Sequence, residues 1–339
     1  MTPAELSRTV RHAVCRAVED GALRVAVPET VRVERPRPGG SGHWASNIAL
    51  RLAREAGRSA AEVAGILGRH LEQAPGIARV EVTGPGFLNL TLADGSQQTL
   101  VRSVLAQGPA YGLPPAAEPC AHDAEPCAHD AEPCAHDAES RAHDAEPCAH
   151  GGELRERVWG ETLARMGARP AAGERLGVVP APDQELAVRL GTDAARWALL
   201  AAAAHDRPRT EGLLVQQERN PLFRVRYAHA RAHALARGAR ALGFAAEPVA
   251  PVDAPALTAA VADHPAAVAD AARLRAPDRL ARHLEAVADA LLSFQHTVLP
   301  VGDEKPSAAH RSRLALAEAA GAVLAGGLSL FGISAPLHL

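Results

Sequence analysis

Residues 220–242 read NPLFRVRYAHARAHALARGARAL, and this stretch predicts a long basic helix. It begins after the Asn220-Pro221 break. The six arginines between 219 and 246 are unaccompanied by any carboxylate; they are Arg219, Arg224, Arg226, Arg231, Arg237 and Arg240. Helical spacing places Arg226, Arg237 and Arg240 on one face together with His233. Such a face is typical of a surface that binds phosphates, but it also fits an ordinary solvated face in an arginine-rich protein.

The sequence around this stretch predicts an all-α bundle over residues 184–339. Helical patterns cover about 184–204, 220–242, 255–274, 277–299 and 306–331, with prolines between them and one more break expected at Pro265. The most apolar stretch, 319–333, is too short for a membrane span and contains several glycines. We expect it to be a buried helix, and we expect no membrane partner.

Residues 1–112 predict a compact α/β domain. An amphipathic helix follows Thr2-Pro3-Ala4-Glu5, and Ser59 opens another. Alternating residues predict strands over 30–34, 78–82 and 87–92, the last two joined by a turn at Gly84-Pro85-Gly86. Further helices are expected over 44–56 and 95–106, the latter closing the domain. The fold class expected for the whole chain is therefore multi-domain α+β.

A seven-residue repeat, Ala-Glu-Pro-Cys-Ala-His-Asp, separates these two regions. Residues 113–152 hold nine carboxylates against one arginine, a net charge of −8, so the rest of the chain, which totals −3, carries +5. The repeat has no apolar seam and proline recurs in it, which excludes a coiled coil and indicates an extended, disordered linker. A connector over 153–183 follows it.

Cys-x-His pairs within the repeat offer a different chemistry, because thiolate and imidazole both bind zinc or copper. The weak metal-ligand candidates are Cys120, His122, Cys127, His129, Cys134, His136, Cys148 and His150. Their spacing fits no zinc finger, so the preferred interpretation is a solvated linker and no metal site.

Composition narrows the class of protein further. Hydrophobic residues make up 47% of the 339 residues and aromatic residues only 3%, a balance that favours a soluble protein built of closely packed helices. The N-terminal residues hold no apolar run of the kind that secretory signals have. We therefore expect a cytoplasmic location.

Several motifs resemble one family, the arginyl-tRNA synthetases. Residues 42–50 (GHWASNIAL) and 84–89 (GPGFLN) resemble its N-terminal tRNA-binding domain. Residues 193–196 (DAAR), 220–231 (NPLFRVRYAHAR) and 328–336 (LSLFGISAP) resemble its C-terminal anticodon-binding domain, named for an Asp-Ala-Leu-Arg signature. The resemblance covers about 1–112 and 184–339.

The resemblance implies roles for particular residues. Phe87 and Asn89 match the positions that receive a base of the tRNA D-loop, by ring stacking and by an amide hydrogen bond. Tyr227, His229 and Arg231 match the helix on the anticodon side. The structural alternatives stay open: Phe87 could be a core aromatic residue of a strand, and Tyr227 and His229 could serve helix packing.

The sequence departs from that family between the two regions. The family carries a nucleotide-binding Rossmann domain there, whereas residues 113–183 number only 71 and include the repeat, with no lysine and no His-x-Gly-His. A doubly wound domain needs on the order of 150 residues. We therefore predict no catalytic residues, no cofactor and no autonomous synthetase.

The resulting hypothesis is that the protein is a catalytically incomplete relative of arginyl-tRNA synthetase. It would bind tRNA, arginine tRNA by preference, or a partner that handles this tRNA. Such a partner could be a separate synthetase or an enzyme that uses aminoacyl-tRNA. Two other classes of function remain open as alternatives to this hypothesis. The helical bundle could be a protein-interaction module whose tRNA surface has decayed, or the Cys/His repeat could make the protein respond to metals or thiols.

Overall fold

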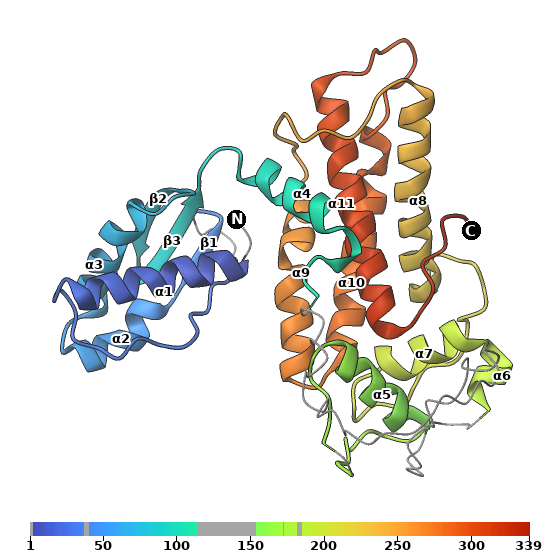
Figure 1. Cartoon of the computed structure of the whole chain (residues 1–339), viewed down its shortest axis with the longest axis horizontal. Coiled ribbons are helices and arrows are strands. Elements are labelled where there is room, and N and C mark those ends of the chain that lie inside the picture. Colours follow the sequence, from blue (N-terminus) through green and yellow to red (C-terminus); the bar gives the residue numbers. More distant parts are fainter. Residues whose placement is uncertain (1–2, 37–40, 114–153, 172, 182–184) are drawn as a thin grey trace, which may run out of the picture.

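The computed structural model describes residues 3–36, 41–113, 154–171, 173–181 and 185–339 (Figure 1). Two hydrophobic cores lie within these ranges. One is formed by residues between Leu6 and Leu90, and the other by residues between Leu100 and Ile333. The fold is thus multi-domain α+β, as predicted from the sequence.

The N-terminal unit is a small antiparallel sheet with three helices. Its elements are α1 (Pro3–Glu19), β1 (Trp44–Ser46), α2 (Ile48–Ala56), α3 (Ala60–Glu72), β2 (Ile77–Thr83) and β3 (Phe87–Leu92). The strand order is β1-β3-β2, and Leu90 of β3 lies opposite both Trp44 and Val80. Helices α2 and α3 pack on the sheet and α1 packs on α3. The Ser59 side chain forms the predicted capping box with Glu62 at the start of α3.

Two expectations for this unit were wrong. The segment expected to be helical from Trp44 begins as strand β1, because its first three residues pair with β3, and the helix starts only at Ile48. The alternating run 30–34 forms no strand; Glu34 alone makes a bridge, exchanging two backbone hydrogen bonds with Ala45.

The second unit is a bundle of helices. Its elements are α4 (Ser96–Gln107), η1 (Gly108–Ala110), α5 (Leu154–Arg165), α6 (Leu186–Leu190), α7 (Thr192–Ala201), α8 (Pro221–Ala241), α9 (Pro255–Arg273), α10 (Pro277–Phe294), η2 (Gln295–Thr297) and α11 (Ala308–Phe331). The helix expected over 184–204 is divided at Gly191, which has a φ of 74°. Pro265 does not end α9, which continues through it.

Helix α4 belongs to the helical core rather than to the N-terminal one. It was expected to close the N-terminal domain, but Leu100, Val101 and Val104 are buried among the helices of the second unit. The Gln97 side chain adds two hydrogen bonds to the backbone of Val252, at 2.7 and 2.9 Å. In Figure 1, α4 lies against α11 and the strands lie apart from it.

Helix α11 is the central helix of the bundle. It is long and apolar enough to cross a membrane by length and composition, but most of its apolar part is buried among the other helices. This burial confirms the sequence-based expectation for 319–333. Two glycines let neighbours approach closely: a Cβ atom on Gly326 would lie 2.3 Å from the Pro109 carbonyl oxygen, and one on Gly327 would lie 2.3 Å from Leu284.

A single buried arginine joins α5 to the end of α7. Arg155 is 0% exposed, and its guanidinium donates five hydrogen bonds to backbone carbonyls. The acceptors are the carbonyls of Leu199, Ala202, Ala203, Val179 and Asp206, at 2.7 to 3.0 Å. The Trp159 indole donates to the Leu199 carbonyl as well, at 2.8 Å. All five guanidinium N–H groups are thereby used, and carbonyls at the end of α7 gain donors that the helix cannot supply.

We expect Arg155→Met to lower the free energy of unfolding by about 3 kcal/mol or more, because each buried carbonyl left without a donor costs roughly 1–3 kcal/mol. Urea denaturation followed by tryptophan fluorescence measures the change. The exposed Arg157 on the same helix provides the control, since Arg157→Met should alter stability by about 0.5 kcal/mol or less. Equal midpoints for the two variants would contradict a structural role for Arg155.

Candidate nucleic-acid interface

The start of α8 is fixed by Asn220. Its side-chain oxygen accepts a hydrogen bond from the Phe223 backbone at 3.2 Å, and its amide nitrogen donates to the carbonyls of Leu213 and Val215 at 2.8 and 2.9 Å. Pro221 takes the first helical position, where no N–H is needed. This cap holds both the start of the helix and the preceding loop in place. It therefore determines the position of the first arginines of α8.

The arginines of α8 divide into two groups. Arg224 pairs with Glu285 and Asp289 at 3.1 and 2.7 Å, and Arg231 donates to the Gln295 side chain at 2.5 Å. Arg226 lies 3.6 Å from Asp193 and is mostly buried. In contrast, Arg237 and Arg240 are exposed, as is Arg219 just before the helix. The exposed arginines are therefore the ones placed to meet an external phosphate.

The last residues of the chain run beside α8 (Figure 1). Arg226 donates to the Ser334 hydroxyl at 3.1 Å, and Arg237 donates to Nδ1 of His338 at 3.4 Å. Between them, Nδ1 of His229 lies 2.9 Å from the Pro336 carbonyl oxygen. The segment 334–338 thus contacts two arginines of the predicted face, Arg226 and Arg237, and the binding of phosphates by this face stays a prediction.

His229 is held inside this contact. It is only 2% exposed, and its Nε2 atom lies 3.2 Å from Nε2 of His233. Burial lowers the pKa of His229, and burial together with the charges of Arg237 and Arg240 lowers the pKa of His233. His229 is therefore buried against the terminal segment, and its predicted contact with tRNA stays a prediction.

Tyr227 lies on the surface instead. It is 40% exposed, and its ring stacks on that of Phe223 with centroids 5.6 Å apart and planes inclined by 19°. Sequence reasoning missed Phe223, although its spacing of four residues from Tyr227 on a helix was a usable signal. The two rings form a stacking surface next to the arginines.

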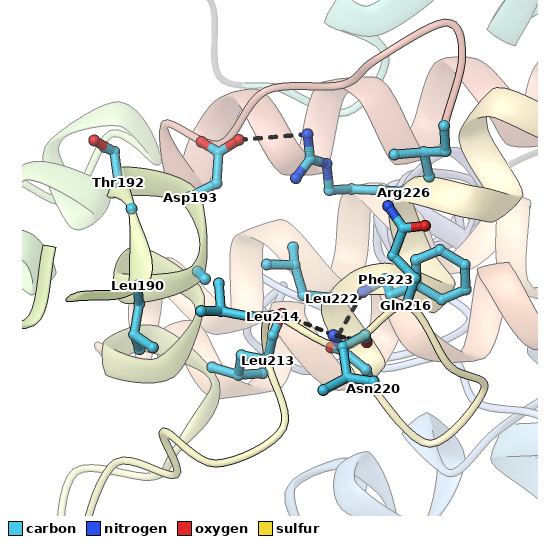
Figure 2. Close-up of a pocket in the computed structure, with 14 residues that line it drawn as sticks. Leu190, Thr192, Asp193, Leu213, Leu214, Gln216, Asn220, Leu222, Phe223 and Arg226 are labelled. Carbon is cyan, nitrogen blue, oxygen red and sulfur yellow. Dashed lines mark hydrogen bonds and ion pairs between the residues drawn. The ribbon is translucent and has the colours of Figure 1, made fainter. Parts of the chain in front are cut away.

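A cleft of about 400 Å³ opens beside this surface at the starts of α7 and α8 (Figure 2). Asp193 and Arg226 lie on one side of it, and Asn220 and Phe223 on another. Exposed Leu214 and Val215 from the preceding loop complete the lining. The cleft thus combines a paired arginine, an aromatic ring and apolar side chains.

The two predicted residues of the N-terminal unit lie on β3. Phe87 is 39% exposed, so it is not a core residue. Asn89 is buried, and its amide nitrogen donates to the hydroxyls of Thr83 and Ser41 at 3.0 and 3.3 Å. The preceding turn packs tightly on α3, because Gly86 has a φ of 138° and a Cβ atom there would lie 2.8 Å from Ala60. The side chains at 87 and 89 share one face of the strand.

The metal-ligand candidates of the repeat lie outside the described residues. Within the described ranges, no group of three or more His, Cys, Asp or Glu side chains is arranged to hold a metal ion.

Comparison with known proteins places both units in one family. Residues 4–92 match the family described as Arginyl tRNA synthetase N terminal domain, and residues 225–339 match the DALR anticodon binding domain. The chain is built from arginyl-tRNA synthetase domains. The first match ends before α4, in agreement with the packing of α4 on the helical unit. The residues of α8 from Arg226 to Arg240 lie within the second match.

Curated relatives are arginine–tRNA ligases. The chain is 48% identical over 112 residues to that of Frankia alni and 46% identical over 115 residues to that of Kineococcus radiotolerans. Each match covers 33% of this chain, and the chain spans about a fifth of the length of these relatives. Among solved structures, Thermus thermophilus arginyl-tRNA synthetase aligns with a TM-score of 0.57 at 14% identity over 100% of both chains, a similarity of fold.

We expect Phe87→Ala to change the free energy of unfolding by less than about 1 kcal/mol, because the ring is partly exposed. The neighbouring Leu88 is 0% exposed and provides the contrast, since Leu88→Ala should cost about 2–5 kcal/mol. Thermal and urea unfolding of the two variants measure this difference. A loss at Phe87 equal to that at Leu88 would place Phe87 in the core.

Proposed function

We propose that the protein binds tRNA, arginine tRNA by preference, and does not itself activate arginine. The observation that carries this proposal is the pair of matched synthetase domains, one carrying the exposed Phe87 and the other the exposed arginines of α8. Binding of this kind belongs in the cytoplasm, where tRNA is charged and used.

On the helical unit, phosphates would bind to Arg237 and Arg240, whose charges lie at the surface. Neutralising phosphates releases counterions and supplies most of the affinity for nucleic acids. The Phe223–Tyr227 stack offers unpaired bases of a loop a ring on which to lie. Arg226 and Arg231 are tied to protein groups, so they act by holding the surface or by exchanging those partners for RNA.

On the N-terminal unit, the exposed ring of Phe87 would stack on a D-loop base. The amide nitrogen of Asn89 is used by Thr83 and Ser41, which leaves its carbonyl oxygen as the acceptor for the base. The tight turn at Gly86 holds both side chains in place. This arrangement suits an unstacked base, which is what RNA loops present.

The chain offers little room for amino acid activation between its two matched domains. Residues 93–224 separate the two matches, and they include α4, α5, α6, α7 and the repeat. A doubly wound nucleotide-binding domain needs on the order of 150 residues of its own. A separate synthetase or an enzyme that uses aminoacyl-tRNA is the partner that this proposal implies. The interaction-module and metal-responsive alternatives stay hypotheses without a specific observation in their favour.

Replacing Arg226, Arg237 and Arg240 with alanine should weaken tRNA binding and make its salt dependence less steep, by about two to three units in log K against log salt, because each lost phosphate contact removes roughly one unit. Filter binding or fluorescence anisotropy at several salt concentrations measures the slope. Arg157, Arg175 and Arg207 are exposed and lie outside both matched domains, so their triple alanine variant is the control. An unchanged slope would show that these arginines contact no phosphate of the tRNA and would contradict their proposed role.

Phe87→Ala and Asn89→Ala should reduce discrimination between arginine tRNA and other tRNAs more than they reduce overall affinity. Stacking of a base on an aromatic ring is worth about 1–3 kcal/mol, and only tRNAs that offer the right base lose it. Competition binding with a panel of tRNAs measures the ratio. A uniform loss for every tRNA would argue against base reading at this position.

Purified protein should show no arginine-dependent exchange of pyrophosphate into ATP. The assay needs a preparation free of host synthetase, with an authentic arginyl-tRNA synthetase as positive control. Exchange that follows the protein through purification would overturn the non-catalytic part of the proposal and leave tRNA binding intact.

A further inference from the structure

A second cleft, of about 530 Å³, lies between α8, α11 and the segment formed by α4 and η1. Its volume is in the range of sites that bind small molecules. The lining is mainly apolar and includes Leu105, Pro109, Ala236 and Phe244. Helices α8 and α11 meet closely beside it, since a Cβ atom on Gly321 would lie 2.9 Å from that of Ala232. The cleft is separate from the one drawn in Figure 2.

Two histidines at this cleft have defined proton positions. The Pro336 carbonyl can only accept, so Nδ1 of His229 carries the proton of their hydrogen bond. With its pKa lowered by burial, His229 is neutral, and its Nε2 atom accepts from the Nε2–H group of His233. His233, whose pKa is also lowered, then has a lone pair on Nδ1. The histidine pair therefore offers a hydrogen-bond acceptor.

Arg240 and Glu318 line the same cleft with opposite charges, and the charge of Arg240 acts on Glu318 without an ion pair between the two described residues. Nε of Arg240 donates to the Ala236 carbonyl of its own helix at 3.3 Å, which leaves the two terminal nitrogens for another acceptor. Glu318 makes no hydrogen bond or ion pair within the described residues. Burial raises its pKa, against the opposing effect of Arg240. The Glu318 oxygens are not among the buried polar atoms, so they are open to the cleft and can accept hydrogen bonds from a ligand that donates.

We infer that this cleft binds a small zwitterion with an apolar side chain, that is, an α-amino acid of this class. The ligand carboxylate accepts from Arg240, and the ammonium group donates to Glu318 and to Nδ1 of His233. The apolar lining receives the side chain. An anion alone leaves Glu318 without a donor, and a cation alone leaves Arg240 without an acceptor, whereas a zwitterion satisfies both. The site goes beyond tRNA binding, with which it shares Arg240.

Isothermal titration calorimetry of the full chain, without RNA, tests the ligand class. L-Leucine and L-phenylalanine should bind saturably. N-acetyl-L-leucine lacks the ammonium group and L-leucinol lacks the carboxylate, so each should bind at least tenfold more weakly. L-Arginine should also bind at least tenfold more weakly, because the apolar lining gives its third charge no partner. Absence of leucine and phenylalanine binding at millimolar concentration, or equal binding of N-acetyl-L-leucine, would overturn the inference.

Variants locate the binding at the cleft. Glu318→Gln and Arg240→Gln should each weaken leucine binding at least tenfold, whereas Glu218→Gln and Arg157→Gln, which alter exposed residues outside the cleft, should leave it unchanged. Ala236→Leu should abolish binding by filling the apolar part while leaving the charged groups in place. Circular dichroism and the melting temperature check that the Ala236→Leu variant is folded. Ala322→Leu on α11 is a second variant that fills the cleft. Leucine binding that survives both filling variants would place the ligand elsewhere and overturn the inference.

Discussion

Five backbone carbonyls accept hydrogen bonds from the guanidinium of Arg155. The positions of α5, α7 and the neighbouring loops depend on this interaction. Carbonyls at the end of a helix lack donors from the helix itself. One planar cation supplies donors to the end of α7 and to two loops at once, so α5, α7 and the loops around Val179 and Asp206 take fixed positions. Asp193, at the other end of α7, is thereby placed beside Arg226 of α8.

Helix α8 serves two surfaces because of how its residues are spaced. Its exposed arginines Arg237 and Arg240 face the solvent beside His233, and His229 and His233 also line the second cleft between α8, α11 and the segment formed by α4 and η1. Arg240 belongs to both, since it is exposed and also lines the second cleft. A ligand in that cleft would therefore occupy a charge that RNA also uses. The terminal segment 334–338 lies across the same residues, so its hydrogen bonds compete with any RNA contact of Arg226 and Arg237.

Local patterns predicted what depends on local interactions. The strands β2 and β3, the capped start of α3 and the start of α8 followed from alternation, a Ser-x-x-Glu box and an Asn-Pro pair. The strand β1 was missed because three residues are too few to show a period, and only pairing with β3 extends them. At the candidate site, the exposed arginines were foreseen as a group and packing of His229 was one alternative, but the burial of Asn89 was not foreseen, because it depends on residues distant in sequence. The role of Arg155 could not be foreseen, since its five partners lie in two distant stretches of the sequence, at Val179 and over 199–206.

The packing of α4 has a consequence for synthesis on the ribosome. The N-terminal unit has its whole core once Leu92 has emerged, but the apolar side of α4 must wait for α11, which ends at Phe331. At about 5–20 residues per second, that interval lasts on the order of ten to forty-five seconds. During this interval Leu100, Val101 and Val104 have no partner helix to pack against. The nascent chain therefore exposes an apolar surface while the rest of the chain is being made. Chaperone binding to the growing chain is therefore most needed between the completion of its first unit and the completion of its second.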